Sequence, residues 1–187
     1  LNVTSLVFEN GVRLHLRPMS EQKNKVEIEI RVAGGEIEET ADNRGMTDAA
    51  SMALLHAGTS HLTPNDLERL LTAKSIAPIG TSQRDHFLIE VSTTPSDLED
   101  AMRVSYALLT DARVDERVFQ RWQERMRDGP ERRRYSLGGQ VNIAANRLFT
   151  GADPRFAPVE PEQAAKISRD AAQAWLDRIL RTRPIEI

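Results

Sequence analysis

Alternation of apolar and polar residues is strongest over residues 25–33, where every second residue is Val or Ile and the residues between them are charged. A period of two is that of a β-strand with one buried and one solvated face. We therefore expect a strand here, and its inward positions are Val26, Ile28, Ile30 and Val32.

Two shorter alternating stretches precede this strand, at residues 3–9 and 11–18. Asn10-Gly11 separates them, and this dipeptide favours a type I′ turn because both of its residues tolerate positive φ. The two stretches are predicted to form a β-hairpin with one buried face. The apolar positions of its second strand are Val12, Leu14 and Leu16.

A second pair of strands is predicted over residues 76–82 and 86–93. In the latter, Phe87, Ile89 and Val91 form the apolar series. A single buried face on each strand is typical of antiparallel sheets, in which the other face meets water.

The helices are predicted from the signals at their ends. Thr63-Pro64 and Thr94-Pro95 each place a capping hydroxyl before a proline, which is tolerated in the first helical turn. Gly58 and Gly129-Pro130 are predicted to end two of the helices, and residues 151–161 are expected to form a loop. The expected helical ranges are 45–57, 96–110, 115–128, 137–149 and 168–181, and a further helix is expected to begin at Thr63-Pro64.

This order of elements predicts an α+β fold, with a mostly antiparallel sheet and helices packed largely on one side of it. A chain of 187 residues suits one domain, and we expect residues 1–187 to form a single α+β domain. The chain starts at Leu1 and ends in Ile185-Glu186-Ile187, which reads as half of a strand. We therefore expect a segment of a longer, multi-domain protein.

Composition narrows the classes of function. The chain is 40% hydrophobic and 28% charged with a net charge of −3, which is typical of a globular protein and argues against a dedicated nucleic-acid or membrane binder. It has no cysteine, so disulfides, thiolate metal sites and cysteine nucleophiles are excluded. No apolar run is long enough to span a membrane. The compartment, periplasm or cytoplasm, stays open.

A catalytic zinc needs three nitrogen or oxygen ligands and one open position. Two ligands on one helix lie one turn apart, so that both imidazoles face the same ion. No two of the four histidines have that spacing, and we predict no metal ligands and no cofactor in this segment. The histidines are His15, His56, His61 and His86.

Residues 31–62 run from a strand into Gly34-Gly35, through an acidic loop and into a helix of small residues that closes with Gly58-Thr59. This layout resembles the inverted-zinc metallopeptidases of the insulinase/pitrilysin family, whose fold is shared with the mitochondrial processing peptidase. Gly45 and either Glu38 or Glu39 also match the family pattern. The likeness covers most of the chain in order and spacing, although its individual motifs are short.

Active members of that family carry Gly-x-x-His-x-x-Glu-His on this helix, and the chain departs from it. Aligned on Gly58-Thr59, the ligand and base positions hold Ala49, Met52 and Ala53; aligned on Gly45, they hold Asp48, Ser51 and Met52. The third ligand in active members is a glutamate on a later helix, where this chain has Glu116 and Glu124. The chain therefore resembles the inactive half that accompanies a zinc-bearing half in this family, and we predict no catalytic residues in it.

Two charged stretches suggest other chemistry. Arg113, Arg117, Arg121 and Arg125 recur every four residues and Arg132, Arg133 and Arg134 follow, but acidic residues are interleaved. We interpret this stretch as a solvated or inter-domain face, and a nucleic-acid surface is the lesser alternative. Glu36, Glu38, Glu39 and Asp42 form an acidic cluster. We interpret that cluster as a loop, with paired-carboxylate acid–base chemistry as its alternative.

The resemblance implies a non-catalytic half-domain that encloses or positions peptide substrate for a zinc-bearing half elsewhere, so that peptide and the catalytic half are its expected partners. Peptide could add to an exposed strand edge. The first alternative is a metal-free assembly subunit of the same fold, and the second is an arginine-mediated binding module. Sequence alone does not identify the substrate-binding residues.

Overall fold

The computed structural model describes residues 2–55 and 58–187. Within them, six strands form one sheet in the order β1-β2-β6-β3-β5-β4. The strands are β1 (Thr4–Val7), β2 (Arg13–Leu16), β3 (Val26–Ala33), β4 (Ala77–Ser82), β5 (His86–Thr93) and β6 (Ile185–Glu186). β2 and β6 run parallel, and the other described pairings are antiparallel. The predicted α+β class is confirmed, and the sheet is mixed.

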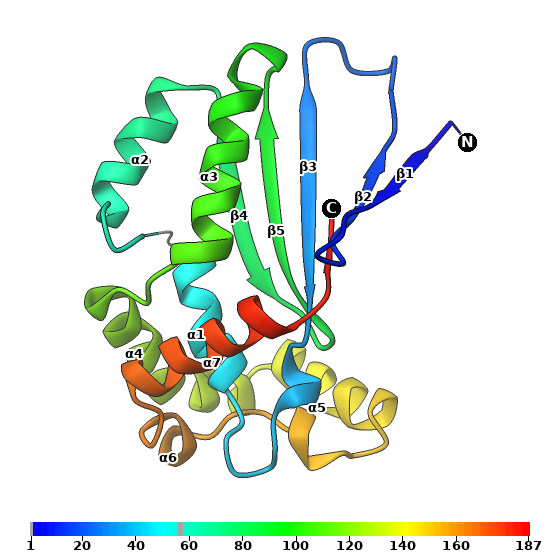
Figure 1. Ribbon diagram of the computed structural model, residues 1–187. Helices are drawn as coiled ribbons and strands as arrows, with labels where there is room; N and C mark the ends of the chain where they lie inside the picture. The colour runs from blue at the N-terminus through cyan, green and yellow to red at the C-terminus, as the bar shows by residue number, and fades with distance from the viewer. Residues whose placement is uncertain (1, 56–57) are drawn as a thin grey trace.

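The helices lie between and after these strands (Figure 1). The α-helices are α1 (Met46–Leu55), α2 (Pro64–Ala73), α3 (Leu98–Asp111), α4 (Glu116–Tyr135), α5 (Leu137–Phe149), α6 (Pro161–Ala164) and α7 (Arg169–Thr182). Three short 3₁₀ turns are η1 (Glu36–Glu38), η2 (Pro95–Asp97) and η3 (Pro154–Phe156). No described helix has the length and apolar character that crossing a bilayer would require.

The core forms on one face of β3 and β5, as the alternation predicted. Their register places Ile28 opposite Val91, and Ile30 opposite Ile89, and these side chains are buried. The opposite face carries charged residues such as Glu29 and is exposed. Each such cross-strand apolar pair stabilises the sheet by about 0.2–1 kcal/mol relative to alanine.

Helix α1 packs tightly against β4 because small residues line the contact. Ala49, Ala50 and Ala53 on the helix are fully buried. A Cβ atom at Gly80 of β4 would lie 2.5 Å from the backbone of Leu54, closer than any real contact, so only glycine fits there. Helices α3 and α7 cover the same sheet beside α1 in Figure 1.

The β1–β2 hairpin departs from the prediction of a buried face. No helix covers it in Figure 1, and most of its residues, including Leu6 and Leu16, are exposed. Its turn also differs from type I′. Gly11 has positive φ and Asn10 does not, and the Gly11 N–H donates to Phe8 O at 2.9 Å. That pattern fits a type I turn followed by a glycine bulge.

Strand β6 is formed by the C-terminal residues that the sequence reads as half of a strand. Ile185 and Glu186 pair within this sheet, between β2 and β3. The Ile187 N–H donates to Arg13 O at 2.8 Å, and the His15 N–H donates to Ile187 O at 2.7 Å. β2 and β3 are separated by a loop and do not pair, so the gap between them accepts a strand from the other end of the chain.

Helix α4 also differs from its prediction, because it continues through Gly129-Pro130 to Tyr135. Proline removes one helical hydrogen bond and bends a helix, but it does not have to end it. The last turns are anchored from outside the helix. Arg134 forms an ion pair with Glu160 at 2.9 Å, and Arg133 donates to Val159 O at 3.3 Å. The segment 151–161 is irregular as predicted, apart from η3.

Candidate functional site

The double glycine after β3 brings the acidic loop against the β4–β5 turn. Gly34 and Gly35 both have positive φ, and a Cβ atom at Gly35 would lie 2.4 Å from Gln83 O. The chain is held there by backbone bonds, since the Gly34 N–H donates to Asp85 O at 2.8 Å and the Ile37 N–H donates to Arg84 O at 2.8 Å. Any side chain at Gly35 would push the two loops apart.

Glu39 fixes the start of α1 from the end of that loop. Its carboxylate is buried and accepts from the Gly45 N–H at 3.0 Å and the Thr47 N–H at 2.6 Å. The Gly45 amide lies just before α1 and the Thr47 amide lies in its first turn. Amides at the start of a helix have no intrahelical partner. Burial raises the pKa of Glu39, and the hydrogen bonds from Thr47 and Gly45 oppose that rise. Glu39 is thus a structural cap.

The rest of the acidic cluster is divided among different neighbours. Glu38 forms ion pairs with Arg178 and Arg183, while Asp42 is exposed. Glu36 is half-buried, and burial raises its pKa while Arg84 lowers it. These carboxylates therefore have different roles. Glu39 caps α1, Glu38 forms ion pairs, and Glu36 lines a cleft.

The helix that would carry a metal site presents no ligand set in either alignment. Ala49, Met52 and Ala53 are buried in the core. In the other register, Asp48 accepts from Trp122 Nε1 at 2.7 Å, and Ser51 Oγ donates to Asp48 O at 2.8 Å. The positions that hold metal ligands and base in active peptidases are therefore used for packing and for a contact to α4.

The histidines lie on separate elements. His15, on the hairpin, contacts Ser5 Oγ at 2.8 Å and Glu186 Oε1 at 2.9 Å. His86, at the start of β5, contacts Asp85 Oδ1 at 2.7 Å, and His61 lies in the turn before α2. His56 falls outside the described residues. Across residues 2–55 and 58–187, no three His, Cys, Asp or Glu side chains are placed to hold a metal ion.

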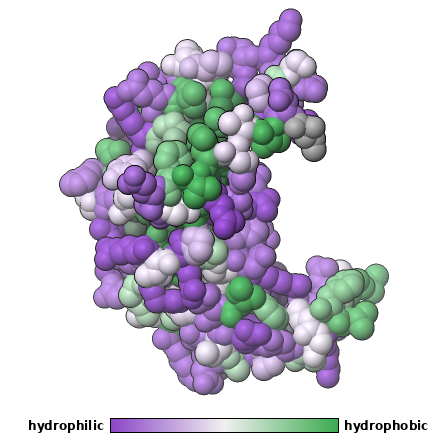
Figure 2. All heavy atoms as spheres, turned by 45° about the vertical axis from the view of Figure 1, so that its right-hand side comes forward, coloured by the Kyte–Doolittle hydropathy of each residue, from purple (hydrophilic) through white to green (hydrophobic). Residues whose placement is uncertain are grey.

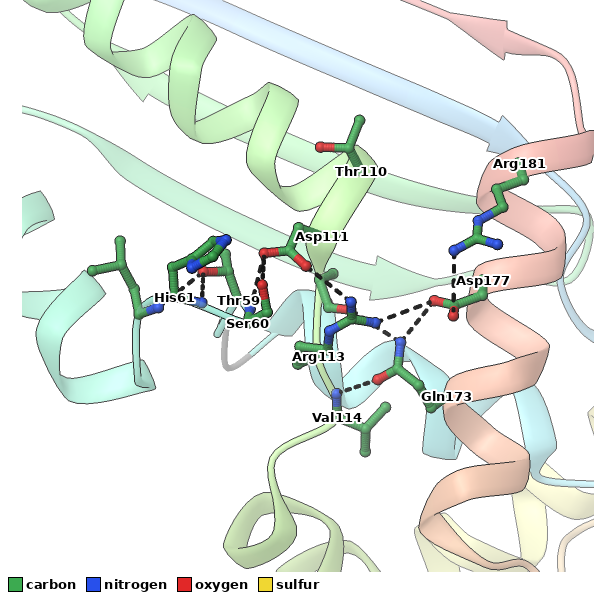
Figure 3. A network of polar contacts seen from close by, with 12 residues as sticks. Thr59, Ser60, His61, Thr110, Asp111, Arg113, Val114, Gln173, Asp177 and Arg181 are labelled. Atoms are coloured by element: carbon green, nitrogen blue, oxygen red, sulfur yellow. Dashed lines mark hydrogen bonds and ion pairs between the residues drawn. The ribbon is translucent and has the colours of Figure 1, made fainter.

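The Gly58-Thr59 motif anchors the end of α1 to α3. Thr59 forms an isolated β-bridge with Ala112, and Ser60 donates to Asp111 Oδ2 from its N–H at 2.9 Å and from its hydroxyl at 2.6 Å. The hydroxyl of Ser60 is the main reason that the pKa of Asp111 is lowered. Figure 3 shows these contacts between the turn before α2 and the end of α3.

The same network continues to α7 (Figure 3). Arg113 binds Asp111 at 3.0 Å. Gln173 of α7 accepts from the Val114 N–H at 2.8 Å and donates to Ala112 O at 3.0 Å. The family-like Gly-Thr pair thus has a structural role here: it binds the segment after α3, which Gln173 in turn ties to α7.

The arginine-rich stretch forms no continuous basic stripe. Arg113 precedes α4 and is paired as described, whereas Arg117 and Arg121 are exposed on α4. Arg125 approaches Asp48 at 3.7 Å. Of the two glutamates in the zone of the third ligand, Glu116 lies 3.6 Å from Arg169 and Glu124 is exposed. Among the residues that the structure describes, neither glutamate belongs to a group that could hold a metal ion.

A polar cleft of about 470 Å³ opens at the N-terminal end of α1. Its walls come from η1, α1, the β4–β5 turn, α4, α5 and the segment around η3. Its lining includes the carboxylates of Glu36 and Asp48 and the guanidinium groups of Arg84 and Arg133. The guanidinium of Arg84 lies over the ring of Phe156 at 5.6 Å and donates to Asn146 Oδ1 at 2.6 Å.

The cleft was not predicted from the sequence, since its arginines and carboxylates come from segments far apart in the chain. One local signal was available: an indole N–H that becomes buried requires an acceptor, and Asp48 supplies it to Trp122. The lining of the cleft therefore carries side chains of both charges.

Comparison with solved structures identifies the fold. The periplasmic protease PqqL from Escherichia coli matches with a TM-score of 0.82 at 19% sequence identity, over 99% of this chain and 21% of that chain. The peptidase M16 inactive domain from Pseudomonas fluorescens matches with a TM-score of 0.82 at 12% identity, over 100% and 46%. A variant of the ferredoxin protease FusC, in complex with Arabidopsis ferredoxin, matches with a TM-score of 0.81 at 18% identity, over 98% and 20%.

These neighbours confirm the insulinase/M16-like fold that the sequence suggested. Identities of this size establish the fold alone. The chain spans about a fifth of the length of PqqL. No protein-family model and no curated protein matches the sequence.

Proposed function

We propose that this chain is a non-catalytic half-domain of a zinc metallopeptidase-like protein, which encloses and positions peptide for a zinc-bearing half. The proposal rests on the residues that stand where active family members carry their zinc ligands and base. Ala49, Met52 and Ala53 are buried, in a fold shared with an M16 inactive domain. Two imidazoles would not fit at the alanine positions without displacing the core.

Strand β4 offers an edge for peptide. It is the last strand in the sheet order, so among the described strands it pairs only with β5. The Gln83 N–H donates to His86 O at 2.8 Å at the turn. Because antiparallel ladders alternate inward and outward groups, the backbone groups of Ser82 point to the free edge. An extended peptide could add there through backbone hydrogen bonds, which bind many sequences.

The cleft lies where that edge ends. Ser82 and Arg84 line it together with Glu36 and Asp48. A peptide on β4 would enter a space lined by both guanidinium groups and carboxylates, which suits charged side chains or a chain terminus. The half-domain would contribute positioning to catalysis, and the hydrolytic chemistry would belong to the zinc-bearing half.

Peptide binding by the purified chain tests this proposal. Fluorescence anisotropy with an unstructured, fluorescein-labelled peptide of mixed charge should show saturable binding. Ser82→Pro removes one outward N–H and should weaken binding, while Val7→Lys, on the exposed hairpin, should leave it unchanged. Circular dichroism and thermal melting check that both variants fold. Saturable binding that Ser82→Pro does not change would argue against the β4 edge.

The catalytic part of the proposal is tested separately. Metal content and peptidase activity should be measured on the same preparation. Stoichiometric zinc with turnover, removed by a chelator, would overturn the non-catalytic assignment.

A metal-free assembly subunit is the second candidate function. The observation that favours it is the set of large apolar side chains exposed on α5 and its flanks, since patches of this kind mark interaction surfaces. Absence of peptide binding, together with stable association through that surface, would favour this candidate.

A further inference from the structure

Three arginines that line the polar cleft bind only uncharged acceptors among the described contacts. They are Arg44, Arg84 and Arg133. Arg84 donates to Asn146 Oδ1 at 2.6 Å, and Arg133 donates to Val159 O at 3.3 Å. Arg44 donates to a backbone carbonyl and to a glutamine side chain. Such acceptors hold a guanidinium group in place, but they do not neutralise its charge.

The other charged side chains of the cleft are mostly bound already. The fourth lining arginine, Arg155, is paired with a nearby aspartate at 2.7 Å. Glu39 accepts from two backbone N–H groups, and Asp48 accepts from an indole N–H and lies 3.7 Å from an arginine of α4. Among the described residues, Glu36 alone of the lining carboxylates has no hydrogen bond or ion pair through its side chain. The cleft therefore has more unpaired guanidinium groups than unpaired carboxylates.

Arg84 is held in place by neighbours that carry no negative charge. Its guanidinium lies over the ring of Phe156 at 5.6 Å, and it donates to Asn146. Asn146 in turn donates from its side chain to Phe156 O. A guanidinium group has five N–H donors, and Arg84 uses one of them in the described hydrogen bonds. A charged group that is already ordered loses less conformational entropy when a ligand binds.

Helix α5 adds amide groups to the same cleft. Asn142 and Asn146 line it, whereas Leu137 and Leu148 are 83% and 77% exposed. Figure 2 shows an apolar lobe projecting at the lower right, where α5 lies in Figure 1. The most exposed apolar side chains of α5 thus lie outside the cleft, and two of the side chains that α5 contributes to it carry N–H donors.

We propose that the cleft binds a carboxylate of the peptide, either an acidic side chain or the C-terminal carboxylate. This inference rests on the proposed function, in which peptide adds to the edge of β4 and continues past Ser82. Arg84 stands two residues beyond Ser82, so the carboxylate would be bound just past the end of the strand. Hydrogen bonds between guanidinium and carboxylate groups are stronger than those between neutral groups. A peptide without a carboxylate cannot form them.

Glu36 should limit this preference, because its carboxylate lines the same cleft. Burial raises the pKa of Glu36, and the charge of Arg84 opposes that rise, so the two side chains interact. A second carboxylate brought into the cleft is repelled by Glu36. Glu36→Gln removes that charge at nearly the same size and should therefore strengthen the binding of acidic peptide.

Isothermal titration calorimetry with three unlabelled, N-acetylated peptides of equal length tests the proposal. The first has internal glutamates and an amidated C-terminus. The second has glutamines in their place and a free C-terminal carboxylate, and the third has glutamines and an amidated C-terminus. The first or the second should bind at least about tenfold more tightly than the third, as expected for a charge-assisted hydrogen bond. Whichever peptide gains affinity identifies the source of the carboxylate.

Variants connect that preference to the cleft. Arg84→Gln and Arg133→Gln should each remove most of it and leave the affinity for the neutral peptide unchanged. Glu36→Gln should instead increase it. Arg69→Gln makes the same change of charge at an exposed position of α2, at the opposite end of the fold from α5 in Figure 1, and should behave as wild type. Thermal melting checks that each variant folds.

The outcomes separate this inference from the proposed function. Equal affinity of the wild type for all three peptides would overturn the carboxylate site and leave the proposed function standing. A preference that neither Arg84→Gln nor Arg133→Gln changes would do the same. Acidic peptides that still bind tightly to Ser82→Pro would support the carboxylate site and argue against the β4 edge. No binding of any peptide would overturn both.

Discussion

The indole Nε1–H of Trp122 donates to Asp48 Oδ2 at 2.7 Å. This bond joins the first turn of α1 to the middle of α4. Asp48 also stands where the first metal ligand would fall if the helix is aligned on Gly45. A position that could serve a metal is therefore committed to holding two helices together.

Removing the acceptor from this pair should destabilise the fold. Asp48→Ala leaves the N–H of Trp122, a residue that is 1% exposed, without a partner, which costs about 1–3 kcal/mol. Asp48→Asn keeps an acceptor oxygen and should cost less. Urea unfolding followed by tryptophan fluorescence measures both, and equal losses in the two variants would contradict the role given to the hydrogen bond.

The close approach of β4 and α1 predicts a strong effect at Gly80. Gly80→Ala places a methyl group 2.5 Å from backbone atoms of Leu54, and overpacking of this kind costs about 1–3 kcal/mol. Gly129→Ala is the matched control, because it lies within α4 with open space around its Cβ position. That change should instead stabilise by about 0.5–1 kcal/mol. Thermal unfolding should therefore show a lower melting temperature for Gly80→Ala and a higher one for Gly129→Ala.

Restoring the motif should not restore the metal. The triple variant Ala49→His, Met52→Glu, Ala53→His recreates the family spacing at positions that are 0%, 4% and 0% exposed. Burying imidazoles and a carboxylate in a packed core is unfavourable, so we expect loss of stability without stoichiometric zinc. Metal analysis after dialysis, with a melting curve, checks this. A folded triple variant that holds one zinc ion would show that the core can open.

Burial of Glu39 predicts a pH dependence of stability. Burial raises its folded pKa above the ordinary value of 4.5, so the folded state binds the proton more tightly than the unfolded state does. Glu39 therefore adds to the free energy of unfolding below pH 4.5, and this contribution is lost as the pH rises through the folded pKa. Glu39→Gln removes the titration. The unfolding free energy of the wild type, relative to Glu39→Gln, should therefore fall as pH increases from about 4.5.

Unfolding in urea at a series of pH values, with both proteins in the same buffers, measures that difference. A Glu39 contribution that grows with pH would mean that the hydrogen bonds from Gly45 and Thr47 outweigh burial.

Local patterns predicted the elements whose stability is decided locally. β3 and β5 have alternating side chains and a shared core face, so their positions and inward residues were predicted. Thr63 caps α2 as expected, since its hydroxyl accepts from the Asp66 N–H. The continuation of α4 beyond Pro130 was missed because its stabilising contacts reach residues 159 and 160, which no local pattern indicates.

The candidate site was predicted only in part, for a similar reason. Only the residue types at positions 49, 52 and 53 can be read from the sequence. The cleft cannot, because Glu36, Arg84 and Arg133 become neighbours only when η1, the β4–β5 turn and α4 come together. The exposure of the hairpin was also missed, since alternation shows which side chains share a face but not whether a helix covers that face.

The insertion of β6 also bears on how the molecule is assembled during synthesis. The hairpin joins the rest of the sheet through β6, and Arg13 and Glu186 pair across almost the whole chain. Contacts of such long sequence separation form slowly. Within this segment the hairpin is made before β6 and is joined to the rest of the sheet only after it, so until then one edge of β2 is unpaired and open to aggregation.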